Sequence, residues 1–120
     1  MARKFELRLE LPFPVSVNQY YRSIPRGKFC SVILSQKGRE FKAKVKEMVG
    51  IDTPTSKPVL VMIKLYPPTK RKYDVDNMLK SLLDSLIGIA YEDDSQISCL
   101  AVSKEEVVSG GKCEIKIREV

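Results

Sequence analysis

Hydrophobic and polar positions along the chain follow patterns that predict strands and helices. Residues 5–11 alternate between apolar and polar side chains, as a half-buried strand does, and Pro12 ends this strand. Residues 59–66 are mostly apolar and β-branched, which is typical of a buried central strand, and Pro67 follows them. Shorter strands are predicted at residues 29–34, 96–103 and 112–118.

Two stretches carry apolar residues at helical spacing. The first begins after Ser35, a residue type that caps helix N-termini, and ends before Gly50, a residue type that ends helices. The second follows Asp76 and ends at Gly88. The wide apolar face of this second helix consists of Met78, Leu79, Leu82, Leu83, Leu86 and Ile87. Its polar face is predicted to hold Asn77, Lys80, Ser81 and Asp84.

The order strand, loop, strand, helix, strand, helix, strand, strand predicts a mixed α/β fold. We expect two main helices to cover a mixed sheet of four or five strands, in a single domain over residues 1–120. Residues 15–28 hold turn residues, two tyrosines and three cations, so we interpret them as a long functional loop. A polar loop is predicted at residues 51–57.

The residue types present narrow the chemistry. The chain has no histidine, which excludes Ser-His-Asp and Cys-His catalysis and the histidine-based nuclease motifs. Cys30, Cys99 and Cys113 are far apart, and without histidine they leave a zinc site short of ligands. We therefore expect reduced cysteines that act as small apolar residues, and chemistry that relies on carboxylates and lysines.

Charge indicates the class of partner. The net charge of +6 favours a polyanion such as nucleic acid, and Lys70, Arg71 and Lys72 form a basic run. No apolar run approaches the roughly 20 residues that span a bilayer, and the N-terminus lacks the apolar stretch of a signal peptide. We therefore expect a cytosolic (cytoplasmic) protein that binds nucleic acid rather than a membrane.

Acidic residues are concentrated in one short region of this basic chain. Six of the fifteen lie between Asp74 and Asp94, and the simplest physical reason is a divalent cation. In an extended chain, Asp74 and Asp76 point to the same side, roughly 6–7 Å apart, and repel each other unless a cation neutralises them. Two metal ions about 3.5–4 Å apart would satisfy both carboxylates. Alternatively, either aspartate caps the helix that follows.

Two further features have alternative explanations. Lys80 lies one turn from both Asp76 and Asp84, so it either forms a surface ion pair or faces a scissile phosphate, with Asp84 holding it. The turn Glu92-Asp93-Asp94 follows the helix C-terminus, where the dipole disfavours negative charge. This favours metal binding over a solvated acidic turn, and one of these acids would complete a three-carboxylate site.

The run D-V-D-N-M-L-K from Asp74 to Lys80, followed by E-D-D-S-Q, closely resembles the RusA-type Holliday-junction resolvases of phages and prophages. The resemblance covers nearly the whole chain and includes an N-terminal stretch containing Asn18, Tyr20, Tyr21 and Arg22. It implies a RusA-like fold and a homodimeric, magnesium-dependent endonuclease that resolves four-way DNA junctions by paired symmetric nicks. Manganese suits the same carboxylate ligands.

Residue by residue, the resemblance assigns roles within this sequence. Asp74, Asp76 and Asp94 match the metal-binding aspartates of the family, and Lys80 matches its essential lysine. Asp93 is the alternative to Asp94. Tyr73 stands where some members keep arginine, a departure that weakens the expectation of phosphate contacts at this position.

The expected reaction is in-line attack of metal-activated water on a phosphodiester. Backbone phosphates would be held by Asn18, Arg22, Lys70, Arg71 and Lys72 and by the rest of the stretch up to residue 28. Tyr20 or Tyr21 would stack on an exposed base, or else pack in the core.

A homodimer suits the two-fold symmetry of a junction. A compact 120-residue domain has a radius of gyration of about 13–14 Å, too small for one site to make two coordinated cuts. Two rival functions remain at this point: a basic module that binds nucleic acid without cutting it, and a nuclease of broader structure selectivity.

Overall fold

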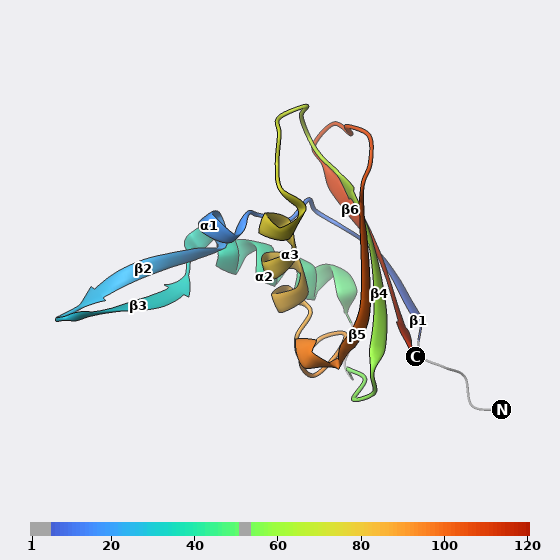
Figure 1. Cartoon of the computed structure of the whole chain (residues 1–120), viewed down its shortest axis with the longest axis horizontal. Helices are drawn as coiled ribbons and strands as arrows, with labels where there is room; N and C mark the ends of the chain where they lie inside the picture. Colours follow the sequence, from blue (N-terminus) through green and yellow to red (C-terminus); the bar gives the residue numbers. More distant parts are fainter. Residues whose placement is uncertain (1–5, 51–53) are drawn as a thin grey trace.

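The computed structural model describes residues 6–50 and 54–120, and in this part of the chain it contains a four-stranded sheet, a two-stranded sheet and three helices (Figure 1). The mixed α/β prediction is confirmed. Phe5 and residues 51–53, which belong to a predicted strand and a predicted loop, lie outside the described residues. No helix of the described chain is long and apolar enough to cross a membrane.

The main sheet has the order β1-β6-β4-β5. Its strands are β1 (Glu6–Leu11), β6 (Lys112–Glu119), β4 (Val59–Tyr66) and β5 (Ile97–Lys104). β6 pairs antiparallel with both β1 and β4, whereas β4 and β5 run parallel. A parallel pair needs a crossover connection, and the helix α3 (Val75–Ser85) provides it. β4 lies between two partners, as its apolar sequence predicts.

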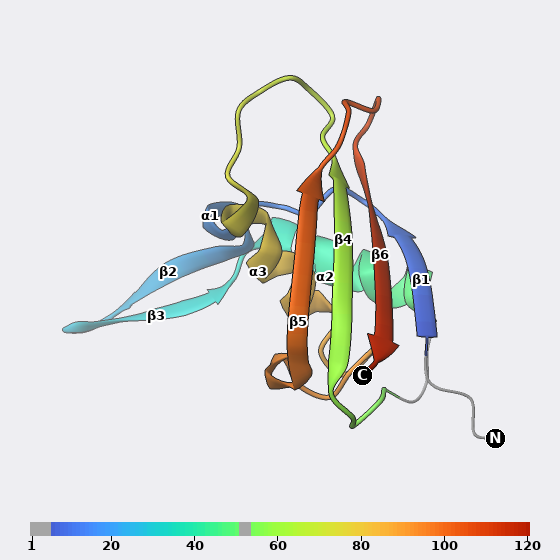
Figure 2. The same ribbon diagram turned by 45° about the vertical axis from the view of Figure 1, so that its right-hand side comes forward.

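Helices α2 (Gln36–Val49) and α3 cover one face of this sheet and leave the other open (Figures 1 and 2). The core forms between them, because alternate residues of β4 point toward the helices. Val61 and Ile63 of β4 are buried on that side, while Met62 and Lys64 face the open side. The prediction of two helices covering a mixed sheet is therefore confirmed.

Helix α2 begins and ends where its sequence predicts. The Ser35 hydroxyl accepts a hydrogen bond from the Gly38 backbone N–H at 3.0 Å, as an N-cap does. Gly50 at the C-cap has a φ of 58°, a left-handed conformation that favours glycine.

Helix α3 differs from its prediction in two respects. It ends at Ser85 rather than at Gly88, because the next residues form a tight turn in which the Gly88 N–H donates to the Tyr91 carbonyl at 2.6 Å. Ser81, predicted on the polar face, is buried, and its hydroxyl donates to the Val15 carbonyl at 2.6 Å. A satisfied hydroxyl is compatible with a buried face, so the polar residue type was misleading here.

Residues 15–28 are not the loop that was predicted. They form the short helix α1 (Val17–Tyr20) and the strand β2 (Tyr21–Arg26), which pairs antiparallel with β3 (Phe29–Leu34). This β2–β3 hairpin projects from the helical layer (Figure 1) and explains a radius of gyration of 15.2 Å, larger than that of a compact domain. Local sequence missed β2 because Pro25 and its polar residues are poor strand formers; pairing with β3 places them in a strand.

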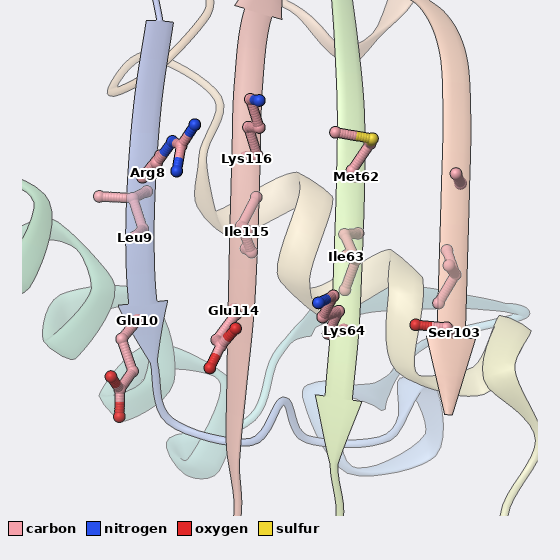
Figure 3. A pocket seen from close by; sticks show the side chains of 12 residues that line it. Arg8, Leu9, Glu10, Met62, Ile63, Lys64, Ser103, Glu114, Ile115 and Lys116 are labelled. Carbon is pink, nitrogen blue, oxygen red and sulfur yellow. The ribbon is translucent and has the colours of Figure 1, made fainter. Parts of the chain in front are cut away.

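The open face of the sheet is hollowed but mostly charge-paired. A hollow of about 640 Å³ lies there. Figure 3 shows side chains that line it, among them Arg8, Met62, Lys64, Ser103, Glu114 and Lys116. Lys116 lies 3.6 Å from Glu6, and Lys112 lies 3.4 Å from Glu114. The acidic residues that the sequence singles out do not line this hollow.

The cysteines differ in their surroundings. Cys113 is buried, and burial raises the pKa of its thiol to about 12, so it remains a neutral core residue. Cys30 and Cys99 are exposed. Of the three, only Cys113 fits the predicted role of a small apolar residue.

Candidate active site

The N-terminal end of α3 presents two carboxylates that have no side-chain hydrogen bond or ion pair among the described residues. Asp74 is the N-cap residue, with an extended backbone, yet its side chain makes no capping hydrogen bond. Asp76 lies in the first helical turn, where the helix dipole favours a negative charge, and both residues are exposed. Because the helix begins at Val75, the two aspartates are not neighbours in an extended strand, which corrects the geometry predicted for them.

The residue before Asp74 is held by the end of β5. The Lys104 ammonium donates a hydrogen bond to the Tyr73 carbonyl at 2.7 Å and lies 4.5 Å from the centre of the Tyr73 ring. Phe13 packs edge-on against the same ring, with 5.6 Å between ring centres. The start of α3 is therefore fixed to the upper end of β5, where the strand finishes (Figure 2).

Lys80 lies one turn further along α3 and is exposed. In the described residues, no carboxylate lies within 4.0 Å of its ammonium group, so the surface ion pair considered for it is not formed. Asp84 instead accepts a hydrogen bond from the Tyr20 hydroxyl at 2.6 Å. Lys80 is thus a free cation on the same helix as the two free carboxylates.

The acidic turn is built by the 3-10 helix η1 (Asp94–Gln96), and Asp93 is used to cap it. The Asp93 carboxylate accepts from the Ser95 N–H at 3.1 Å, and hydrogen bonds with Ser95 lower the pKa of Asp93. Asp94 has no side-chain hydrogen bond within the described residues. Of the two aspartates considered as metal ligands, Asp94 is therefore the one whose carboxylate is available to a metal ion.

Gln96 holds this turn together through both ends of its amide. Its oxygen accepts from the N–H groups of Glu92 and Asp93, each at 2.8 Å. Its nitrogen donates to the carbonyls of Thr55 and Lys57, at 2.9 and 2.8 Å. Residue type alone does not reveal this role: Gln96 ends the E-D-D-S-Q run, but the partners of its amide nitrogen are 41 and 39 residues away.

Asp94 lies at the opposite end of α3 from Asp74 and Asp76. An α-helix of 11 residues is roughly 16 Å long, and Figure 1 shows η1 beside the last turn of α3. Within residues 6–50 and 54–120, no three acidic or cysteine side chains are grouped closely enough to hold a metal ion. One chain thus provides the expected carboxylates in two separate places.

Tyr21 lies near charged residues of both α3 and the acidic turn. Burial, and next the negative charge of Asp84, raise the pKa of Tyr21; Lys80 opposes this shift, and Asp94 adds to it. The adjacent Tyr20 is fully buried and hydrogen-bonded to Asp84, so it packs in the core and is not open to a base. Of the two tyrosines, only the half-buried Tyr21 is available to a ligand.

The predicted phosphate-binding residues lie on two exposed segments. Lys70, Arg71 and Lys72 lie on the loop between β4 and α3, immediately before the free carboxylates. Asn18 of α1 and Arg22 of β2 are also exposed. The β2–β3 hairpin contains no acidic residue. The loop with Lys70, Arg71 and Lys72 leads directly into α3, and α1, which leads into the hairpin, contacts α3.

Comparison with known proteins gives a consistent result. The family model described as "Endodeoxyribonuclease RusA" matches residues 12–118. The crossover junction endodeoxyribonuclease rusA of Enterobacteria phage HK97 is 34% identical over 119 residues, covering 96% of each chain. The proteins of the same name from Escherichia coli strain K12 and Enterobacteria phage 82 are 32% and 31% identical, each covering 93% of both chains. The chain therefore belongs to the RusA family of endodeoxyribonucleases.

Proposed function

We propose that this protein is a metal-dependent endonuclease that resolves four-way DNA junctions by paired nicks. The observation that carries the proposal is the first part of α3, where two free carboxylates and an unpaired lysine follow a basic loop. Relatives that cover nearly the whole chain are named crossover junction endodeoxyribonucleases. A four-way junction is thus the substrate that best fits both the site and its relatives.

Carboxylate oxygens are the ligands that suit magnesium or manganese. Asp74, Asp76 and Asp94 fit this role because their side chains are free of capping and other hydrogen bonds in the described chain. When bound, the cation supplies Lewis-acid stabilisation of the negative charge that builds on the phosphate as water attacks.

Lys80 acts on the phosphate directly. With no carboxylate within 4.0 Å in the described residues, its ammonium is available to a phosphoryl oxygen next to Asp76. It would orient the phosphodiester and stabilise the charge that develops on it, a role worth roughly 100- to 1,000-fold in rate. Lys80→Met should therefore slow nicking of the junction by about this factor. Lys44→Met, at an exposed lysine of α2, is the matched control and should nick at the wild-type rate.

A homodimer of this chain would contain two complete active sites, each built from residues of both copies. Because α3 separates Asp94 from Asp74 and Asp76, the third carboxylate of each site comes from the other copy in a two-fold homodimer. Such a dimer has two equivalent sites, as symmetric cleavage of a junction requires. Lys70, Arg71, Lys72 and Arg22 would then hold backbone phosphates on either side of each site, with Tyr21 near the reacting strand.

Cleavage of a synthetic four-way junction with and without Mg²⁺ tests the activity. We expect paired nicks with metal, and none for Asp76→Asn, which should still fold and still bind the junction. Glu106→Gln, at an exposed carboxylate on the loop before β6, is the matched control and should cleave normally. Binding without nicking across several junction sequences would support the binding-module rival. Equal cleavage of flaps and single strands would support broader structure selectivity.

Mixing two inactive variants tests whether each site uses both copies. In a dimer of Asp76→Asn with Asp94→Asn, one site loses both groups and the other keeps both, so mixing should restore nicking of one strand. If each site were complete within one chain, every site in the mixture would lack one carboxylate. The mixture would then stay as inactive as the separate variants.

A further inference from the structure

We propose that Lys104, the last residue of β5, is a positioning residue for Asp74: it holds the peptide that carries Asp74 and leaves the carboxylate free. The inference rests on the proposed function, because Asp74 is one of the metal ligands proposed there. The Lys104 ammonium donates a hydrogen bond to the Tyr73 carbonyl at 2.7 Å and lies 4.5 Å from the centre of the Tyr73 ring. One side chain thus contacts both the backbone and the ring of the residue directly before Asp74.

The place of Asp74 depends on the peptide that joins it to Tyr73. Asp74 is the N-cap of α3, with φ of −94° and ψ of 134°, so its backbone is not helical. The Tyr73 carbonyl and the Asp74 nitrogen belong to one planar peptide unit, so a bond that fixes the carbonyl also fixes the nitrogen. The buried residues of α3 are Ser81, Leu82 and Ser85, all in its second half. Core packing therefore holds the start of the helix less firmly than its end.

The loop before α3 has few other ties to the rest of the molecule. It covers residues 67–74, and Figure 2 shows it arching away from the sheet between β4 and α3. Within the described chain, the bond from Lys104 is the one hydrogen bond between residues 68–73 and another segment. The Arg71 N–H bonds inside the loop, to the Thr69 hydroxyl. Lys104 is therefore the contact that can set where this loop delivers Asp74.

The Tyr73 ring gives the Lys104 side chain a fixed surface. Phe13 packs edge-on against this ring, with 5.6 Å between the ring centres. The Tyr73 hydroxyl is buried and has no hydrogen-bond partner among the described residues, so it adds no bond that would hold Tyr73 in place. The ring and the carbonyl, both in contact with Lys104, are the parts of Tyr73 that fix the loop.

Lys104 holds the backbone without occupying a carboxylate. Glu105 and Glu106 follow it in the sequence, yet in the described residues no carboxylate lies within 4.0 Å of its ammonium group. An ion pair between Lys104 and Asp74 would compete with a metal ion for the same oxygens. A hydrogen bond to the preceding carbonyl does not compete, so the carboxylate is both held and available.

Binding of Mn²⁺ to the protein without DNA tests this role separately from activity. Groups that orient a metal ligand typically contribute 10- to 100-fold to metal affinity. We expect Lys104→Met to bind Mn²⁺ roughly tenfold more weakly in a titration followed by electron paramagnetic resonance. Lys104→Arg keeps a donor and a cation on the ring, so it should restore most of the affinity. Tyr73→Phe, which keeps the ring and the carbonyl, should bind like the wild type.

Lys64→Met is the matched control, because Lys64 is an exposed lysine of the neighbouring strand β4 and also has no carboxylate within 4.0 Å in the described residues. It should bind Mn²⁺ like the wild type. Equal Mn²⁺ affinity of Lys104→Met and the wild type would overturn the inference. Weaker junction binding without metal, at unchanged Mn²⁺ affinity, would also overturn it and assign Lys104 to a DNA phosphate.

Hydrogen exchange in the absence of metal provides a second measurement. Amides in the first two turns of α3 should exchange several-fold faster in Lys104→Met than in Lys64→Met, and equal exchange would contradict the inference. If Mn²⁺ affinity depends on Lys104 but the wild-type protein never nicks a junction, the proposed function fails while the inference stands. If the wild type nicks and Lys104→Met nicks at the same Mg²⁺ concentration, the inference fails while the proposed function stands.

Discussion

The side chain of Gln96 shows how much one residue shapes this site. Its amide oxygen bonds the backbone of the acidic turn, and its nitrogen bonds the chain just before β4. No charged group is involved, so the turn that presents Asp94 depends on neutral hydrogen bonds. Each is worth on the order of 1 kcal/mol net.

We predict that Gln96→Ala releases this turn. The free energy of unfolding should fall by roughly 1–3 kcal/mol, because four backbone groups lose their hydrogen bonds to this side chain. The Mg²⁺ concentration for half-maximal nicking should rise, because Asp94 is no longer held. Gln36→Ala, at an exposed glutamine that bonds only Glu40, is the matched control. An unchanged Mg²⁺ dependence would show that Gln96 does not position Asp94.

Two buried tyrosines give stability a dependence on alkaline pH. Burial, followed by the hydrogen bond and charge of Asp84, raises the pKa of Tyr20; burial, followed by the charge of Asp94, raises that of Tyr91. A pKa raised in the folded state contributes stability that is complete below the unfolded value of about 10 and is lost as the pH rises above it. We therefore expect the protein to lose stability above pH 10, and Tyr20→Phe to lose less. Chemical denaturation from pH 8 to 11 measures the free energy of unfolding at each pH, with Tyr66→Phe as the control. If the free energy of unfolding of Tyr20→Phe fell with pH as steeply as that of the wild type, the prediction would be wrong.

At the scale of elements, the contact between α1 and α2 decides where Tyr20 lies. Gly38 in the first turn of α2 is buried, and a Cβ at this position would overlap the Tyr20 carbonyl. The Ser35 hydroxyl also donates to the Gln19 carbonyl, so the two helices are joined at their ends. Through Tyr20, this contact reaches Asp84 on α3.

We predict that Gly38→Ala separates α1 from α2. Because the obstacle is backbone, the clash cannot be relieved by a side-chain rotation, and overpacking of this kind costs about 1–3 kcal/mol. Thermal unfolding should show a lower midpoint. Lys37→Ala, at the exposed preceding residue, should leave the midpoint nearly unchanged. If Gly38→Ala left the midpoint of thermal unfolding unchanged, α1 could move away from α2 without loss of stability, and the prediction would be wrong.

At the scale of the whole molecule, charge is distributed between two faces. The open face of the sheet pairs Lys112 and Lys116 with glutamates, whereas the loop before α3 presents Lys70, Arg71 and Lys72 unpaired among the described residues. DNA should therefore approach the side that carries α3 and the hairpin.

We predict that replacing Lys70, Arg71 and Lys72 by alanine weakens junction binding and its salt dependence. Each lost phosphate contact reduces the slope of log K against log salt by about 0.9, so three contacts account for up to roughly 3. Titrations at several salt concentrations measure the slope. The control replaces Lys112 and Lys116, on the open face of the sheet, by alanine. If this control lost as much of the salt-dependence slope, the DNA would bind the open face and our proposal for the binding side would be wrong.

Much of this fold follows from local pattern. The capped helix α2, the buried strand β4 and the amphipathic start of α3 depend on interactions within a few residues, and each was predicted close to its observed place. The hairpin was not predicted, because β2 is a strand only through its pairing with β3. The burial of Tyr20 and Ser81 likewise depends on partners more than sixty residues away.

The sequence by itself determined the chemistry available to this protein: no histidine, several carboxylates and a lysine around α3, basic segments, and the family to which these motifs point. Only the tertiary structure decided which of these groups are free and where they lie. It assigned Asp93 to a cap, left Asp94 and Lys80 unbonded within the described chain, and set Asp94 a helix length from Asp76. The physical reason is that residue type limits what a side chain can do, while long-range hydrogen bonds and packing decide which partners it meets.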